Sequence, residues 1–256
     1  MPDIYLAPIT RDNLDEYLKD LAKEFRRLNG RKTPAVIILV GGASVLANYN
    51  FRDTTCDVDA IIIASSAMKD AIRRVGEKHA LPHGWLNVGF TRTGSYSNKL
   101  FEVSVFYKTF SNIVTIRAVT AEYLLAMKLI SGRLYQSDIS DIVGILREHQ
   151  KRGRAISRVA IESAVESLYG SCATIPEKSR QLLDAIFENG DYEALYMHVC
   201  ESESVSKELL LEFERNYANM LQSESINSII NSDRREHHAE QNEFMLASLK
   251  EKKRQA

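Results

Sequence analysis

An apolar run that leads into two glycines, with two aspartates soon after it, constrains the fold of this chain most strongly. Residues 36–40 read Val-Ile-Ile-Leu-Val, which is typical of a buried strand, and Gly41 and Gly42 follow at once. Asp57 and Asp59 flank a valine and precede a second apolar run. Because side chains alternate along a strand, both carboxylates are expected on one face. The sequence therefore predicts two strands, joined through a glycine turn, that converge on an acidic site.

The two aspartates predict a metal site. Like charges about 7 Å apart along a strand repel each other unless a cation or a basic group lies between them. Carboxylate oxygens favour Mg²⁺ or Mn²⁺, which bind a few protein ligands together with substrate phosphates. Gly41 and Gly42 let the backbone approach a phosphate, and the helix-compatible residues 43–48 would offer free N–H groups to the anion. Asp57 and Asp59 are thus the expected metal ligands.

This order of features resembles the nucleotidyltransferase superfamily, which has the polymerase-β-like fold. In that superfamily a Gly-Gly or Gly-Ser turn, a helix and an Asp-x-Asp strand follow one another, and the aspartates hold the metal that carries a nucleoside triphosphate. The resemblance implies an α+β fold of the α/β type: a small mixed β-sheet core flanked by helices and followed by a helical C-terminal domain. It also implies Mg²⁺ or Mn²⁺ as cofactor and transfer of a nucleoside monophosphate to an acceptor.

A second motif follows the predicted sheet. Lys128 lies within an apolar helical run, and a buried lysine needs an anionic partner or a route to solvent. Asp138 and Asp141 open the next helical segment, where acidic residues also complement the helix dipole. The Leu-Leu-Ala-x-Lys-Leu helix, Arg133 and the Asp-x-x-Asp-Ile segment resemble AbiEii-like toxins, including the MenT-type nucleotidyltransferases, and related bacterial families. The resemblance implies that Lys128 binds nucleotide phosphate, that Asp138 or Asp141 is the acidic active-site group, and that Arg133 binds phosphate or pairs with those aspartates.

The resemblance to the nucleotidyltransferase superfamily adds further candidates. Catalytically complete members carry a third carboxylate on a later strand, as a base or second metal ligand. Glu102 is the only acidic residue in the two strand-like segments 100–107 and 113–118, so it is the candidate, and an outward-facing strand residue is the alternative. Arg52 either clamps a phosphate or pairs with nearby acidic residues. The nucleotide-binding set implied in this way is Gly41, Gly42, Ser44, Arg52, Lys128 and Arg133.

The remaining patterns are mostly helical. Residues 12–29 and 66–80 have apolar stripes at helical spacing, and the loop 81–87 carries Trp85, either a platform for a nucleobase or a half-buried anchor. Strand patterns disappear after Lys151, so we expect a nucleotidyltransferase-like domain over 1–150 and a helical domain over 151–256. Within the latter, helices are expected over 156–168, 176–188, 192–200 and 204–221.

Composition narrows the class of protein. A net charge of −1 gives no global reason for binding to nucleic acid or membranes. Three widely spaced cysteines fit a reducing compartment, and residues 1–30 lack the apolar core of a signal peptide, so a cytoplasmic location is expected. No run approaches the roughly 20 apolar residues that span a bilayer.

The leading hypothesis is a metal-dependent nucleotidyltransferase whose substrate is a nucleoside triphosphate and whose acceptor is an RNA, such as tRNA, or a protein. If the likeness to AbiEii-like proteins extends to biology, the chain is the toxin of a toxin–antitoxin or phage-defence pair, with a separate antitoxin as partner. Two alternatives stay open. One is a catalytically weak or inactive nucleotide-binding or regulatory protein with the same fold, and the other is an interaction protein whose helical half binds a partner.

Overall fold

The computed structural model describes residues 9–30, 33–55, 57–132 and 138–216. The chain divides into two compact units, each built from two stretches of sequence. The first unit consists of Met1–Ser131 and Val159–Thr174, and the second of Gly132–Arg158 and Ile175–Ala256.

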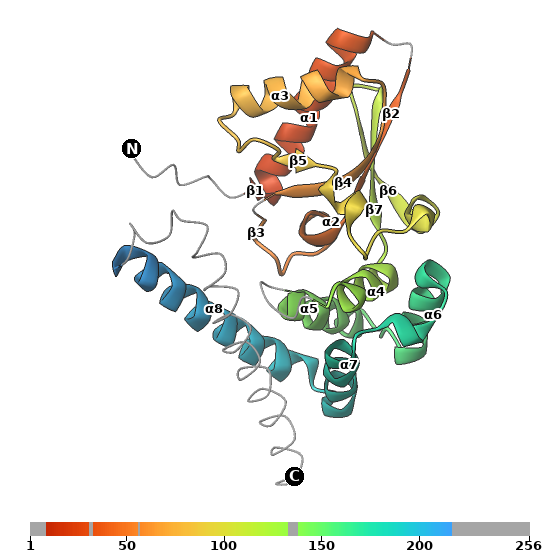
Figure 1. Cartoon of the computed structure of the whole chain (residues 1–256), viewed down its shortest axis with the longest axis vertical. Coiled ribbons are helices and arrows are strands. Elements are labelled where there is room, and N and C mark those ends of the chain that lie inside the picture. The colour runs from red at the N-terminus through yellow and green to blue at the C-terminus, as the bar shows by residue number, and fades with distance from the viewer. Residues whose placement is uncertain (1–8, 31–32, 56, 133–137, 217–256) are drawn as a thin grey trace. The chain divides into compact units, whose positions relative to one another are not determined.

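A mixed sheet of five strands, in the order β5-β4-β2-β7-β6, forms the centre of the first unit (Figure 1). Its strands are β2 (Ala35–Leu39), β4 (Val58–Ile63), β5 (Leu86–Asn87), β6 (Ser104–Phe110) and β7 (Val114–Val119). Strand β2 is central: it pairs with β4 antiparallel and with β7 parallel. Strand β5 runs parallel to β4, and β6 runs antiparallel to β7. A small antiparallel pair, β1 (Ile9–Thr10) with β3 (Thr54–Thr55), lies beside it. The mixed sheet predicted from the sequence is confirmed.

Helices α1 (Arg11–Asn29) and α3 (Ala67–Lys78) pack side by side against one face of this sheet (Figure 1). A capping box starts α1: Thr10 Oγ1 accepts from the backbone N–H of Asn13, and the Asn13 side chain accepts from the N–H of Thr10. The buried stripe of α1 has the spacing of one helix face and consists of Leu14, Leu18, Leu21 and Phe25. Full burial of each such side chain contributes about 1.5–3 kcal/mol.

Trp85 is an anchor of this core. Its side chain is 1% exposed, and its indole Nε1 donates to the carbonyl oxygen of Ile72 at 3.1 Å. Its own carbonyl accepts from Val58 N at 2.8 Å, which ties it to the edge of β4. The hypothesis that Trp85 is a platform for a nucleobase is therefore wrong, because both faces of the ring lie inside the protein. The strand β5, which starts at the next residue, was not predicted.

The segment before β6 also differs from the prediction. Residues Asn98–Phe101 form a 3₁₀ turn, η2, and the strand begins only at Ser104. Ser97 accepts from Lys99 N at 3.4 Å, and Ser104 Oγ donates to the Phe101 carbonyl at 2.7 Å. Such short polar side chains offer the backbone local hydrogen bonds that compete with a sheet ladder. Glu102 consequently lies in the turn, exposed, and not on a strand.

Three more helices complete the first unit: α2 (Gly41–Asn48), α4 (Ala121–Ser131) and α6 (Arg158–Tyr169), the last of which starts one residue before the unit boundary. Hydrogen bonds join α6 to the segment before β6, and side chains of both the helix and the segment act as donors. Ser97 Oγ donates to the Leu168 carbonyl at 3.1 Å, Lys99 Nζ to the Ser167 carbonyl at 2.6 Å, and Tyr169 Oη to the Ser95 carbonyl at 2.7 Å.

The second unit is helical in its described part. It contains α5 (Asp138–Lys151), α7 (Glu177–Asn189) and α8 (Tyr192–Asn216). The Arg147 guanidinium lies 3.8 Å from the ring centre of Tyr196, and Lys151 Nζ is 2.6 Å from Glu193 Oε2, so α5 and α8 are joined by charge and stacking. A break between residues 200 and 204 was wrongly predicted, because the polar residues there include no glycine or proline to end the helix. None of the helices in the described ranges combines enough length with enough apolar character to cross a membrane.

Candidate functional site

The first part of the site is the junction of β2 with α2. The strand ends at Leu39 and the helix begins at Gly41, which has φ of 54°. Only glycine adopts this left-handed conformation without strain, so the sharp turn depends on it. The N-cap residue Val40 gives no side-chain hydrogen bond to the helix. The first backbone N–H groups of α2 therefore have no capping side chain, and a helix start of this kind attracts anions.

The second part is the acidic pair at the start of β4. Val58 and Ala60 are fully buried, whereas Asp57 is exposed and Asp59 partly exposed. This alternation places both carboxylates on the side away from the core. Asp59 lies against the glycine turn: a Cβ on Gly41 would be 3.8 Å from Asp59 Oδ2, and Val40 N donates to the Asp59 carbonyl at 3.0 Å.

Arg52 and Thr55 pack directly on Gly42. A Cβ built on Gly42 would lie 2.8 Å from Arg52 Nη2 and 2.9 Å from Thr55 Oγ1, distances too short for any side chain. Arg52 Nε donates to the Thr54 carbonyl at 3.0 Å, and Thr55 Oγ1 donates to the Asp57 carbonyl at 3.1 Å. The absence of a side chain at Gly42 thus lets a guanidinium reach the start of α2, next to the aspartate segment.

Asn87 also lies at the acidic pair, although it was not predicted as a site residue. Its Nδ2 donates to Asp57 Oδ2 at 3.2 Å, and in the sheet it is the partner of Asp59. No motif marks this residue in the sequence. Only the pairing of β5 with β4 brings it to the site.

The side chain of Ser44, a predicted nucleotide-binding residue, contacts other parts of the protein. It is fully buried, its Oγ donates to the Val119 carbonyl at 3.4 Å, and Asn48 Nδ2 donates to the same Oγ at 3.4 Å. Its backbone N–H bonds to the Val40 carbonyl at 3.3 Å. These contacts join α2 to β7, so phosphate binding by the Ser44 hydroxyl would require them to break.

The other predicted site residues are spread over both units. Lys128 lies in α4 of the first unit and is 6% exposed, a degree of burial that makes an ammonium group costly without an anionic partner. Glu102 is in the exposed turn before β6. Asp138 and Asp141 open α5 in the second unit, where Asp141 is 2% exposed. Arg133 lies outside the described residues.

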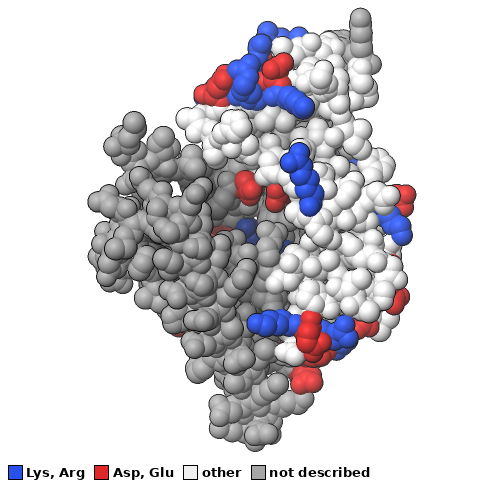
Figure 2. All heavy atoms as spheres, in the orientation of Figure 1, with Lys and Arg blue, Asp and Glu red and all other residues white. Residues whose placement is uncertain are grey.

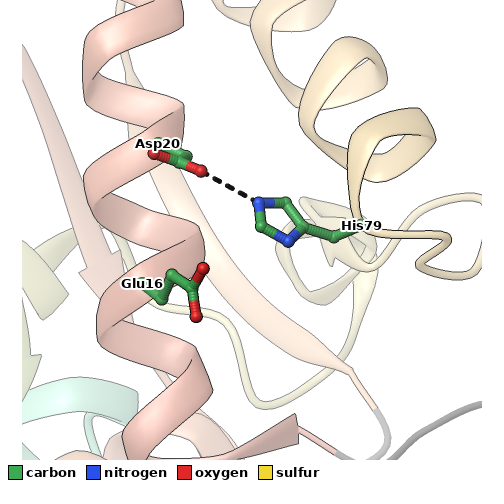
Figure 3. Close-up of side chains that lie close together, drawn as sticks. All are labelled: Glu16, Asp20 and His79. Atoms are coloured by element: carbon green, nitrogen blue, oxygen red, sulfur yellow. Dashed lines mark hydrogen bonds and ion pairs between the residues drawn. The ribbon is translucent and has the colours of Figure 1, made fainter.

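A separate group of possible metal ligands lies between α1 and α3. Figure 3 shows Glu16 and Asp20 on one helix and His79 reaching Asp20 from the end of the other, and their ligand atoms all lie within 4.8 Å of one another. Asp20 also accepts from Lys78 and from Lys23, the latter at 3.0 Å. Hydrogen bonds from Lys78, then Lys23 and His79, hold the pKa of the Asp20 carboxyl well below its usual range.

The contacts of Lys23 and Lys78 with Asp20 bear on whether this group of side chains could bind a metal ion. Two ammonium groups already balance the charge on Asp20, and a metal ion would have to displace them. Figure 2 shows acidic and basic side chains intermingled over the region of α1 and α3. The cluster is therefore a charge network that joins two helices, and the glycine turn stays the predicted metal site.

The donor set at the glycine turn fits Mg²⁺ or Mn²⁺. Asp57 and Asp59 supply carboxylate oxygens, which these hard cations prefer. Within the described ranges the two aspartates do not belong to a cluster of three metal-binding side chains. A cation held there would complete its coordination with water and substrate phosphates, as Mg²⁺ commonly does.

Comparison with known proteins agrees with this geometry. Residues 16–147, just over half of the chain, match the family described as "Nucleotidyltransferase of unknown function (DUF6036)". The matched region contains the glycine turn, Asp57, Asp59 and Lys128. No curated protein and no solved structure matches the chain. Because the family match covers more than half of the sequence, this chain belongs to the DUF6036 family of nucleotidyltransferases.

Proposed function

We propose that this protein transfers a nucleoside monophosphate from a nucleoside triphosphate to an acceptor hydroxyl, with a divalent cation held by Asp57 and Asp59. The observation that carries the proposal is the position of the Asp59 carboxylate beside Gly41, where β2 turns into α2. The helix start attracts phosphate, whereas a carboxylate repels phosphate and attracts a cation. A cation bound to a polyphosphate satisfies both.

The chain's own groups have separate roles in the transfer. The N–H groups at the start of α2 bind phosphate oxygens, and the guanidinium of Arg52, packed on Gly42, adds positive charge beside them. The acceptor oxygen attacks the α-phosphorus, the bond from that phosphorus to the oxygen of the leaving pyrophosphate breaks, and the hydroxyl proton passes to a base or to water. When bound, the cation neutralises charge on the phosphoryl oxygens.

Lys128 is proposed as a further phosphate ligand. The likeness of the Leu-Leu-Ala-x-Lys-Leu helix to AbiEii-like proteins supports this role. Arg133 is assigned to phosphate binding on the sequence motif alone. Asp138, Asp141 and Glu102 are the proposed sources of the additional carboxylate, and Asp138 and Asp141 are proposed on the sequence motif alone.

The acceptor and the biological role rest on the likeness to AbiEii-like and MenT-type proteins. We propose an RNA such as tRNA, or a protein, as acceptor, and a toxin function with a cognate antitoxin. A second candidate is a nucleotide-binding protein of the same fold without turnover. The position of Glu102 in a turn, away from the strand where a third carboxylate was expected, favours this candidate.

Label transfer tests the proposal. The full chain is incubated with each α-labelled nucleoside triphosphate, Mg²⁺ or Mn²⁺, and either total tRNA or a protein mixture. We expect transfer to fall at least about 10²-fold in Asp57→Asn and in Asp59→Asn, since several kcal/mol of charge stabilisation are lost. Asp53→Asn, at an exposed acidic residue of the same segment, is the matched control and should retain activity.

The outcomes of this experiment distinguish the proposed transferase from the non-catalytic candidate. Transfer that survives both aspartate substitutions excludes the proposed metal site. Nucleotide binding that depends on Asp57 and Asp59, without transfer to any acceptor, supports the non-catalytic candidate instead.

A further inference from the structure

The side chain of Asn87 is held between two fixed partners. It lies in β5, whose pairing with β4 places it opposite Asp59. Its Nδ2 donates to Asp57 Oδ2 at 3.2 Å, and its Oδ1 accepts from the backbone N–H of Gly89 at 2.7 Å. One end of the amide is therefore bound to the backbone and the other to a proposed metal ligand.

The Gly89 contact determines which end of the amide faces Asp57. A backbone N–H can only donate, so the atom that it meets must be the amide oxygen, and the NH₂ group must point the other way. Gly89 also leaves the space that this geometry needs, because a Cβ there would lie 3.0 Å from Asn87 Oδ1. The donor directed at Asp57 is thus set by the backbone of the β5–η1 turn (η1, Gly89–Arg92).

Asp57 needs such a support more than Asp59 does. Asp59 is within β4, while Asp57 precedes the strand and is exposed. An exposed carboxylate outside a strand ladder rotates among several rotamers, and ordering it costs free energy when a metal binds. A hydrogen bond to one oxygen reduces that cost and leaves the other oxygen to bind a cation.

We propose that Asn87 is a positioning residue for the metal site: its amide, oriented by Gly89, fixes the rotation of the Asp57 carboxylate. The inference rests on the proposed function of Asp57 and Asp59. Partners that orient metal ligands in this way typically change metal affinity 10–100-fold when they are removed, about the range expected here.

The test measures Mn²⁺ binding by the full-length protein, from the electron paramagnetic resonance signal of free Mn²⁺, alongside transfer rate against Mn²⁺ concentration. Asn87→Ala should weaken Mn²⁺ binding about 10-fold or more, and saturating Mn²⁺ should restore much of the maximal rate. Asn98→Ala, at an exposed asparagine of the same unit, is the control and should bind as the wild type does.

A second pair of variants leaves the asparagine in place. Gly89→Ala keeps the backbone N–H but sets a methyl group against Asn87 Oδ1, so it should also weaken Mn²⁺ binding. Gly94→Ala has nothing within 4 Å of the added carbon and should have no effect. Thermal unfolding of all four variants checks that the fold is kept.

The outcomes separate this inference from the function on which it rests. If Asp57→Asn and Asp59→Asn weaken Mn²⁺ binding while Asn87→Ala and Gly89→Ala match their controls, the positioning role is refuted and the metal site stands. If the wild type binds no Mn²⁺, or the aspartate variants bind it unchanged, the metal site itself is refuted. Weakening by the aspartate, Asn87 and Gly89 variants together supports both.

Discussion

At the β2–α2 turn, Gly42 is important because it has no side chain and so leaves space for neighbouring groups. Gly42 admits the Arg52 guanidinium and the Thr55 hydroxyl to positions less than 3 Å from where a Cβ would be. In Gly42→Ala both groups must move, and we expect nucleotide affinity to fall by about 10-fold, which corresponds to the roughly 1.4 kcal/mol of one displaced charged contact. Isothermal titration with a nucleoside triphosphate measures this loss.

The control for that substitution is Gly94→Ala, which adds a methyl group in open space. Equal nucleotide affinity of the two variants would show that Arg52 does not serve the site.

Lys128 offers a way to separate function from stability at one position. Lys128 has an interaction partner within the protein, and removing one member of a buried interaction usually destabilises the fold. Lys128→Met should therefore lower the midpoint of thermal unfolding, and its role as a phosphate ligand predicts in addition that triphosphate affinity and transfer activity fall at a temperature where the variant is folded. A lower unfolding midpoint with unchanged affinity would assign Lys128 to the fold instead.

Residue patterns show what the sequence can and cannot predict about the site. Gly41, Gly42, Asp57 and Asp59 form a local motif whose spacing predicts a turn and a strand; Asp59 lies on β4, whereas Asp57 lies just before it. Asn87 belongs to no motif, because its contact with Asp57 arises from pairing between strands far apart in the chain. Ser44 was included in the nucleotide-binding set, since the sequence does not show that its hydroxyl donates to the Val119 carbonyl of β7.

At the level of elements, α1 and α3 are joined by charge as well as by apolar packing. The lysine contacts of Asp20 lower the pKa of its carboxyl, so the ionised form stabilises the folded state. That stabilisation is present above the unfolded-state pKa of about 4 and is lost as the pH falls toward the lower folded-state value.

Asp20→Asn should therefore lower the free energy of unfolding by about 1–2 kcal/mol at pH 7, a modest value because both lysines are largely exposed. The difference between variant and wild type should shrink between pH 4 and pH 2, within the approximate range where the carboxylate is protonated. Urea unfolding at pH 7 and pH 2.5 measures both values. A difference that is the same at the two pH values would contradict the charge network.

A helix with a clear apolar periodicity was predicted almost to the residue, whereas a short strand and a turn without such a pattern were not predicted. The apolar stripe and asparagine-glycine end of residues 12–29 correspond to α1, Arg11–Asn29. The two-residue strand β5 has too few positions to show any period, and its register comes from β4. The 3₁₀ turn before β6 contains apolar residues that read as a strand, although serine hydrogen bonds determine its backbone.

At the scale of the whole molecule, the first unit, which contains the sheet, also includes α6, a helix that follows residue 150 in the sequence. Ser97, Lys99 and Tyr169 carry hydrogen bonds between α6 and the segment before β6, and burial raises the pKa of the Tyr169 hydroxyl. The division into domains at residue 150 stays a prediction, and these contacts allow it to be examined.

We expect a fragment of residues 1–150 to unfold at a lower temperature than the full chain, because it lacks all three hydrogen bonds to α6. In the full chain, Tyr169→Phe should cost about 1 kcal/mol, the usual net value of one hydrogen bond. Thermal unfolding followed by circular dichroism measures both. If the fragment is as stable as the whole protein, residue 150 is a sufficient boundary and α6 adds nothing to the sheet.

The return of the chain to the sheet unit also has a consequence for synthesis. A polypeptide leaves the ribosome from its N-terminus, and the last stretch of this unit, Val159–Thr174, follows a segment that belongs to the other one. Helix α5 is thus translated before the sheet has received its final helix. The nascent protein cannot finish its first unit until Thr174 has emerged, and by then α5 of the second unit has already been made.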